Sequence, residues 1–312
     1  MIIFLMCLSL FACRDTGDTG SESVFSDALS TEDSGISEGL ASAEALIEQG
    51  EYEQAYKLLY GIRQNEKAAE LLSGFKVLPL KIRGNGTSWI LYTDFKCDNT
   101  YDENGLLTGK TEVSNHNCTE VFTYTYDDQG RLITEKRVKK FEGESKSYTE
   151  YNSYTYNEHG DVASLESSDL GFTYRIDYEY TYSEDGKILS VTDLSSEETT
   201  RYVYNDAGQL IEKANESAVY RYTYDKNGNL IKETINEDYE AQNSMTEYTY
   251  DSDGRLIQTV TTSTHSGSKQ SASCKYEYNE YGILVKEIHS DVERQDYTQA
   301  YSDFVYFYSP QE

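Results

Sequence analysis

The residues best suited to chemistry are few in this chain and lie far apart in the sequence. Its four histidines stand singly, without the spacing to a cysteine or to a second histidine that a metal site needs: His116, His159, His265 and His289. The sequence contains no glycine-rich phosphate loop and no nucleophile elbow. It therefore predicts a protein that is not an enzyme and that has neither a metal site nor a cofactor.

The cysteines that follow the N-terminal region are Cys97, Cys118 and Cys274, an odd number that leaves at least one thiol unpaired. Cys97 and Cys118 are expected on strands that lie two apart in a sheet. That separation is about 9.6 Å, beyond the reach of a disulfide. A slip in register at the irregular segment "SNHNC" would bring the two thiols together, so the state of these cysteines stays open.

Acidic turns are the remaining candidates for metal binding. The segments "DENG" from Asp102, "DKNGN" from Asp225 and "DSDG" from Asp251 resemble parts of calcium loops, but none has the full set of spaced ligands ending in Glu. An Asp, two free residues and a Gly are also what a type I turn followed by a left-handed glycine requires. The turn role explains these residues without a metal.

The turn belongs to a repeat. "YTYDDQGRLI" at residues 124–133 returns with few changes at 222–231 and 248–257, and the pattern Tyr-x-Tyr-Asp-x-x-Gly-x-Leu is recognisable eight times. The turn glycines are Gly105, Gly130, Gly160, Gly186, Gly208, Gly228, Gly254 and Gly282. The turn should place the tyrosine before the Asp directly across from the aliphatic residue two positions after the Gly, so that Tyr224 faces Leu230.

These elements predict a mainly β fold. Eight hairpins and a last strand near "DFVYFYS" give about 17 strands between residues 87 and 310. Because a twisted sheet of that width curls, we expect a long antiparallel β-hairpin meander coiled into an open superhelical sheet. The face that carries the tyrosines and leucines should line its inner side. Residues 41–76 have a helical period and form a short helical segment before the repeats.

Two stretches carry a family resemblance. "YTYDDQGRLI" and its copies resemble the YD repeats of Rhs and teneurin-type surface and toxin proteins, in which many repeats wind into a hollow shell. The Pro- and Gly-rich core region of that family is missing, since the prolines are Pro79 and Pro310. The resemblance implies a short, surface-anchored YD-repeat protein. In the helical segment, "GEYEQA" at residues 50–55 is similar to the middle of one tetratricopeptide unit.

The N-terminal sequence predicts where the protein is located in the cell. The apolar run "MIIFLMCLSLFAC" at residues 1–13 suits a signal peptide, and Cys13 after Leu10, Phe11 and Ala12 resembles a lipobox. Cys13 would then be lipidated and would anchor an extracytoplasmic, cell-surface protein to the membrane. An ordinary secretory signal is the alternative. Residues 14–40 are acidic and poor in apolar residues, which predicts a disordered tether.

The net charge of the chain limits which partners it can bind. The chain has 27 Lys and Arg against 55 Asp and Glu, a formal net charge of −28. Such a surface repels phosphate backbones, so nucleic acid is excluded as a partner.

This pattern favours a non-catalytic module at the cell surface. Such a module would bind glycans, cell-wall components or a protein, or would act as a scaffold. The pattern Tyr-x-Tyr-Asp has an earlier and a later tyrosine. The earlier one should face a polar residue, as Tyr222 faces Lys232 and Tyr202 faces Glu212. We therefore expect exposed, ligand-binding rings at Tyr202, Tyr222 and Tyr248, and core rings at Tyr204, Tyr224 and Tyr250. Two alternatives stay open: a partner or remnant of an Rhs-type toxin system and, less favoured, an enzyme that uses the concave face.

Overall fold

The computed structural model describes residues 29–87, 93–114, 118–237, 243–265, 267–291 and 298–310. The chain divides into two compact units, Met1–Leu78 with Tyr306–Glu312, and Pro79–Val305. The predicted signal peptide at residues 1–13, its lipidated Cys13 and the first part of the tether lie outside the described residues.

The described residues of the first unit form three helices, α1 (Leu29–Glu48), α2 (Tyr52–Gly61) and α3 (Glu66–Ser73). Ala43, Leu59 and Ala68, one from each helix, are fully buried against one another, and Leu40 and Ile62 pack on them. Small residues at two of these positions let the helices approach closely. No helix in the described ranges combines the length and the apolar character needed to cross a bilayer.

The helical segment starts earlier than predicted. Helix α1 begins at Leu29 and not at residue 41, so residues 29–40 are helical, and the prediction of a disordered tether is wrong for this part. The reason is visible in the packing. Leu40 contacts the buried cluster, and Gly39 lies so close to Ile62 that an added Cβ would stand 3.2 Å from its Cδ1. Tertiary contacts offset a composition that favours disorder.

The strands form one antiparallel series. They are β1 (Phe75–Thr87), β2 (Thr93–Tyr101), β3 (Leu107–Ser114), β4 (Cys118–Tyr126), β5 (Leu132–Phe141), β6 (Ser147–Tyr156), β7 (Val162–Asp169), β8 (Phe172–Tyr182), β9 (Ile188–Asp193), β10 (Thr199–Tyr204), β11 (Leu210–Ala214), β12 (Ala218–Tyr224), β13 (Leu230–Glu237), β14 (Asn243–Tyr250), β15 (Leu256–His265), β16 (Ser268–Tyr278), β17 (Leu284–Asp291) and β18 (Thr298–Pro310).

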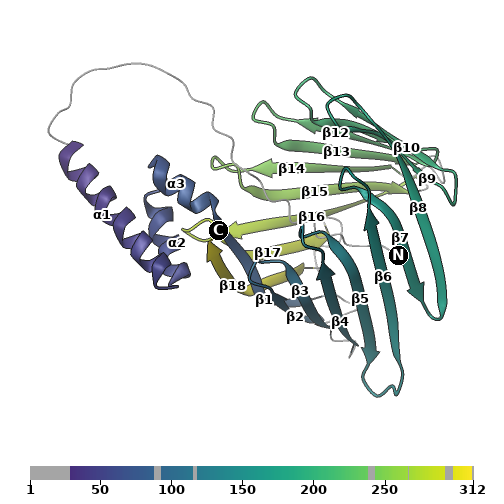
Figure 1. Ribbon diagram of the computed structural model, residues 1–312, viewed down its shortest axis with the longest axis horizontal. Coiled ribbons are helices and arrows are strands. Elements are labelled where there is room, and N and C mark those ends of the chain that lie inside the picture. Colours follow the sequence, from purple (N-terminus) through teal and green to yellow (C-terminus); the bar gives the residue numbers. More distant parts are fainter. Residues whose placement is uncertain are drawn as a thin grey trace. The chain divides into compact units, whose positions relative to one another are not determined.

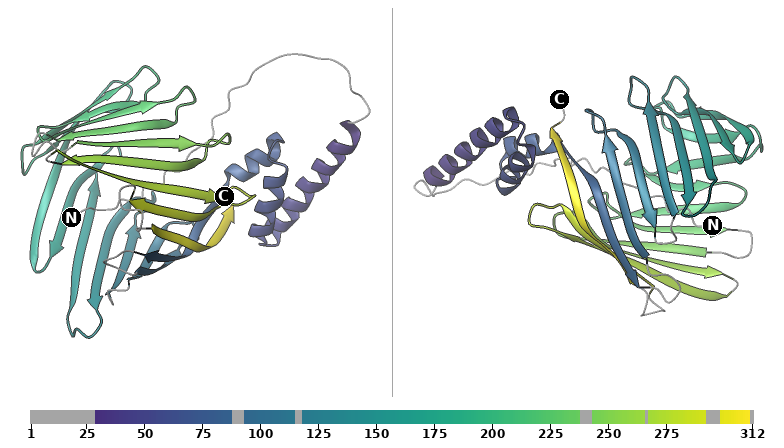
Figure 2. Two further views of the ribbon diagram at one scale, coloured as in Figure 1. Left: turned by 180° about the vertical axis from the view of Figure 1, so that it is seen from behind. Right: turned by 90° about the horizontal axis from the view of Figure 1, so that it is seen from below.

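Each strand from β1 to β17 pairs antiparallel with the next one along the chain. Figures 1 and 2 show the strands of the second unit side by side in chain order, in a strongly curved sheet. The predicted mainly β fold is confirmed, since β2 to β18 supply seventeen strands of a hairpin meander in the described part of the chain. The prediction did not include β1, which pairs with both β2 and β18.

The turns have the predicted geometry. All eight turn glycines have a positive φ, as Gly130 does at 76° and Gly228 at 90°. The first turn residue, an Asp, Asn or Ser, accepts from the backbone N–H four residues on, at 2.8 to 3.0 Å in every repeat. The tyrosine before it pairs with the aliphatic residue two positions after the Gly, as Tyr224 does with Leu230, so this register is confirmed.

Beyond that pair the predicted register is wrong by one residue. Tyr222 lies opposite Glu233 and not Lys232, and Tyr202 lies opposite Lys213 and not Glu212. The cause is a β-bulge directly after the turn, where the isoleucine of "RLI" or "NLI" has no partner in the register. One extra residue on the returning strand shifts every later pair by one position.

The left-handed turn glycine can be tested at Gly254, where φ is +78° and an added Cβ would meet no atom within 4 Å. Gly254→Ala should therefore lower the free energy of unfolding by about 1–2 kcal/mol through backbone strain alone. Ser252→Ala, at an exposed position of the same turn, is the matched control. Thermal unfolding followed by circular dichroism measures both, and equal melting temperatures for the two variants would contradict the turn type.

Candidate functional site

The two faces of the sheet differ in burial. Along β12 the tyrosines Tyr220, Tyr222 and Tyr224 are half-buried, whereas Arg221 and Thr223 between them are exposed. The same alternation holds in β10, β14 and the end of β16. We call the shielded side the tyrosine face. Because alternate residues point to opposite sides of a strand, both tyrosines of each repeat lie on this face.

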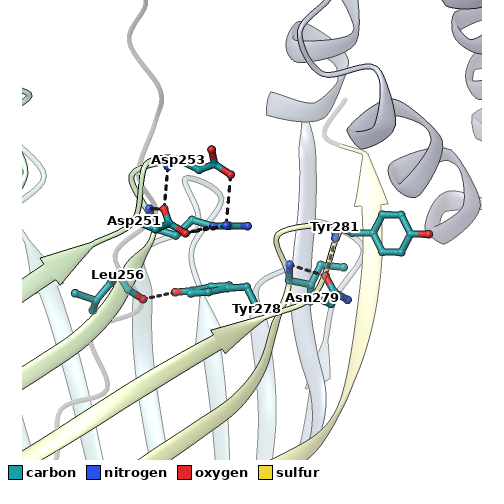
Figure 3. Close-up of polar contacts among 8 residues, drawn as sticks. Asp251, Asp253, Leu256, Tyr278, Asn279 and Tyr281 are labelled. Atoms are coloured by element: carbon teal, nitrogen blue, oxygen red, sulfur yellow. Dashed lines mark hydrogen bonds and ion pairs between the residues drawn. The ribbon is translucent and has the colours of Figure 1, made fainter.

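The tyrosine hydroxyls connect each hairpin to the one before it. The later tyrosine of a repeat donates to the backbone carbonyl of the aliphatic residue beside the preceding bulge, at 2.6 to 3.0 Å, and Figure 3 shows Tyr278 and Leu256 in this arrangement. The donor and acceptor pairs are Tyr126–Leu107, Tyr156–Leu132, Tyr204–Ile188, Tyr224–Leu210, Tyr250–Leu230 and Tyr278–Leu256. We call this series the tyrosine ladder.

The ladder extends to β1 at its start. Tyr101, in the first repeat, has no preceding hairpin, and its hydroxyl donates to the carbonyl of Pro79 in β1 at 3.0 Å. The first repeat has Asn99 where the others have their earlier tyrosine, and the Asn99 side chain donates to the same carbonyl at 2.7 Å. Strand β1 therefore takes the place of a preceding repeat.

Cations add a second contact between repeats. In three repeats the residue after the turn glycine is a cation that lies over the ring of the later tyrosine of the next repeat. Arg131 is 4.6 Å from the Tyr156 ring centre, Lys187 is 5.8 Å from that of Tyr204 and Arg255 is 5.2 Å from that of Tyr278. Arg131 also pairs with Asp127 at 2.7 Å. The backbone hydrogen bond from Arg131 is the main reason why the pKa of Asp127 lies below its usual range.

The aspartates of the turns accept hydrogen bonds from backbone N–H groups. In "DKNGN", Oδ1 of Asp225 accepts from the backbone N–H groups of Asn227 and Asn229, at 2.8 and 2.9 Å. Asp251 does the same for Asp253 and Arg255, both at 2.9 Å, as Figure 3 shows for Asp253. These contacts are those of a turn, which is the role that the sequence predicted for these aspartates.

The ladder changes at one repeat. Here the earlier tyrosine, Tyr180, donates to the carbonyl of Val162 at 2.7 Å. The later one, Tyr182, donates to Asp161 Oδ2 at 2.8 Å, accepts from Asn157 at 2.7 Å, and its ring stacks on His159 with centres 4.1 Å apart. His159, which stood alone in the sequence, is therefore part of this irregular junction.

A pocket of about 400 Å³ opens on the tyrosine face beside this junction. Its lining includes the cross-strand pairs Tyr154–Leu165 and Tyr180–Val191, together with Asp161. In several other repeats the earlier tyrosine faces a glutamate, as Tyr124 does with Glu135 and Tyr222 with Glu233. Replacement of that glutamate by Leu165 and Val191 makes this stretch of the face apolar.

Tyr178 and Tyr202 complete the aromatic lining of the pocket. Burial raises the pKa of both, and that of Tyr180 to about 12, so their hydroxyls stay protonated at neutral pH. Within the described residues no protein group accepts from or donates to the hydroxyls of Tyr154, Tyr178 and Tyr202. These three hydroxyls can therefore serve a ligand.

Of the three tyrosines predicted to bind a ligand, one lines this pocket and two do not. Tyr202 lines the pocket, whereas Tyr222 and Tyr248 are not in its lining, and the Tyr248 hydroxyl donates to Glu233 at 3.1 Å. All three are half-buried, and so are Tyr204, Tyr224 and Tyr250. The predicted division into exposed and core rings is therefore wrong, because both tyrosines of a repeat share one face of a single sheet.

The three cysteines in the described residues, Cys97, Cys118 and Cys274, are free thiols in buried positions. Cys97 on β2 pairs with Glu112, and Cys118 on β4 with Ser114. Cys274 differs from these two because it lies opposite His289, with Glu287 nearby. Burial alone would lower the pKa of His289, but its hydrogen bonds to Cys274 and Glu287 raise it to about 9. Sequence spacing missed this group, since its members come from two strands and meet only through the register.

Two family models match the chain, the RHS repeat over residues 101–139 and the teneurin YD-shell over residues 192–308. The chain is a YD/Rhs-type repeat protein. The resemblance seen in the repeats is thereby confirmed, and the tyrosine ladder is a contact between consecutive YD repeats. No curated protein matches the chain.

Several solved structures are similar to this YD-repeat chain. The crystal structure of TcdB2-TccC3-Cdc42 shares 16% identity over 77% of this chain and 17% of that one, with a TM-score of 0.35. The Tc holotoxin pore of Photorhabdus luminescens shares 14% over 77% and 17%, with a TM-score of 0.25. A porin-like protein from Bacteroides uniformis shares 15% over 74% and 96%, with a TM-score of 0.38. The chain thus spans 17% of the length of the two toxin chains.

The tyrosine ladder can be tested by removing one hydroxyl. Tyr250→Phe keeps the ring but leaves the Leu230 carbonyl without its donor, so the free energy of unfolding should fall by about 1 kcal/mol. Tyr151→Phe is the control, because that tyrosine is 40% exposed and should change stability by less than about 0.5 kcal/mol. Urea unfolding followed by circular dichroism distinguishes them. Similar effects at both positions would contradict a ladder that stabilises the array.

Proposed function

We propose that this YD-repeat protein is a non-catalytic binding module whose pocket on the tyrosine face takes a carbohydrate ligand. The observation that carries the proposal is the gathering of Tyr154, Tyr178, Tyr180 and Tyr202 around one hollow of about 400 Å³. That volume falls within the range of small-molecule sites.

The lining suits a sugar in two ways. Tyrosine rings offer flat apolar faces to the C–H side of a pyranose, at little cost in conformational entropy. The hydroxyls of Tyr154, Tyr178 and Tyr202 and the carboxylate of Asp161 can pair with the hydroxyls at the edge of the sugar ring. A strongly anionic ligand fits less well, because the pocket contains a carboxylate and the chain has a net charge of −28.

The binding test uses the full-length protein and a panel of neutral oligosaccharides and peptidoglycan fragments, with affinity measured by calorimetry. Tyr202→Ala should weaken binding of the best ligand by about tenfold or more, which is typical of a central aromatic contact. Tyr151→Ala is the matched control, because Tyr151 is three residues from Tyr154 and so points to the other face of β6. Absence of binding at millimolar concentration, or equal losses in the two variants, would reject the pocket as a glycan site.

The proposed place of action is the extracytoplasmic face of a membrane. The support is in the sequence, where an apolar run ends in "LFAC" and an acidic stretch follows Cys13. Two acyl chains on Cys13 would hold the protein stably, whereas one would not. In a bacterial host, Cys13→Ala should move the protein from the detergent phase to the soluble extracytoplasmic fraction. A variant that still partitions into detergent would show that Cys13 is not the anchor.

A second candidate function is that of a partner to a larger Rhs-type toxin system. It is favoured by the two family models, which match repeats of that type in both halves of the chain. In that case the tyrosine face would contact a protein, and the oligosaccharide panel would give no binding while co-purification with an Rhs protein encoded nearby would succeed.

A further inference from the structure

We propose that Cys274, Glu287 and His289 form a transition-metal site, best suited to Zn²⁺, on the tyrosine face between β16 and β17. Cys274 and His289 are directly opposite in the register of these two strands. Glu287 lies two residues before His289 and so points to the same side of β17. The site is separate from the pocket beside Tyr202 and does not depend on glycan binding.

The ligand atoms of the three side chains lie close together. His289 Nε2 is 3.6 Å from Cys274 Sγ and 3.3 Å from Glu287 Oε2, and the three ligand atoms all lie within 4.8 Å of one another. Zinc bonds of about 2.3 Å to sulfur, 2.0 Å to nitrogen and 2.1 Å to oxygen, at tetrahedral angles, separate S from N by about 3.5 Å and N from O by about 3.4 Å. The sulfur-to-nitrogen and nitrogen-to-oxygen separations in the structure match those of a tetrahedral site.

A nucleophilic role for Cys274 fits the geometry less well. In a nucleophile–histidine–acid triad the two ring nitrogens have separate partners, one receiving the proton of the nucleophile and the other donating to the acid. Here the same nitrogen, Nε2, contacts both Cys274 and Glu287. Contacts that meet at one nitrogen describe a set of ligands around a common centre and not a proton relay.

The donor set selects the type of metal. A thiolate, an imidazole and a carboxylate together suit Zn²⁺ and related transition metals, whereas Ca²⁺ and Mg²⁺ require oxygen ligands. Three protein ligands leave a fourth tetrahedral position for water or another donor. Cys274 is 7% exposed, and the side chains of Glu287 and His289 are 16% and 24% exposed, so the site is shielded but can be reached from solvent.

Neighbouring groups can hold the ligands in place. Tyr276 lies opposite Glu287 in the register and two residues after Cys274, so its side chain lies beside the ligands on the same face of the sheet. Such outer contacts orient the ligands of a metal site. A bound metal would cross-link β16 to β17 and should raise the thermal stability of the protein, since it binds the folded state alone.

The test uses the full-length protein without a histidine tag, treated with chelator, dialysed and reloaded with Zn²⁺ or Co²⁺. Elemental analysis should give one Zn²⁺ per chain, the Co²⁺ form should show thiolate-to-cobalt absorption, and Zn²⁺ should raise the melting temperature by a few degrees. Cys274→Ser should abolish the thiolate band. Both this variant and Glu287→Gln should bind Zn²⁺ at least tenfold more weakly, while circular dichroism checks that each variant is folded.

Cys118→Ser is the matched control. Cys118 is also a buried strand cysteine and has a glutamate oxygen, Oε1 of Glu120, 3.9 Å from its sulfur, but it lies opposite Ser114 and not a histidine. It should keep full Zn²⁺ affinity and the cobalt–thiolate band. The proposal is overturned if the reloaded protein holds no stoichiometric Zn²⁺, if its cobalt spectrum lacks the thiolate band, or if Cys118→Ser loses the metal as Cys274→Ser does.

Discussion

The hydrogen bond from a tyrosine hydroxyl to the carbonyl beside the preceding bulge is the contact on which this array depends. The bulge interrupts the regular pairing of the sheet at the same point in each repeat, and the hydroxyl supplies a donor at that point. Each such bond contributes only about 0.5–1.5 kcal/mol net. Its effect comes from repetition, since the same bond connects successive hairpins from β2 to β17 with one change of donor.

The repeats need these bonds because the sheet has a sparse core. Within the described part of Pro79–Val305 the buried apolar side chains are few, and most of them are small: Ile82, Cys97, Cys118, Ala218, Cys274 and Ile283. The tyrosines themselves are half-buried. Stability therefore comes from many partly buried rings and from the hydrogen bonds of the strands and turns, summed along the chain as in other repeat proteins.

The candidate binding pocket lies where this regularity changes. Between β6 and β9 the ladder bond is made by the earlier tyrosine, Tyr180, and not by the later one, Tyr182. The Tyr182 hydroxyl instead donates to Asp161, and its ring stacks on His159. In the same stretch Leu165 and Val191 lie opposite the earlier tyrosine, where three other repeats have a glutamate. A departure from the local rule of a fold is typical of a functional position. The Cys274 group is a second departure, because a thiol and an imidazole there occupy one cross-strand pair.

The sequence by itself determined what depends on a few adjacent residues. The turn chemistry, an Asp, Asn or Ser three residues before a Gly, located the central hairpin of each of the eight repeats. It also assigned positive φ to the glycines and placed Tyr224 opposite Leu230, because all of these interactions close within about ten residues. Tertiary structure decided what depends on distant partners. The bulge moved Tyr222 from Lys232 to Glu233, helix α1 packed Leu40 against the other helices, and the register of β16 against β17 brought Cys274 to His289. A one-residue shift in register changes which side chains face each other across two strands. The spacing of residues in a single sequence does not reveal such a shift.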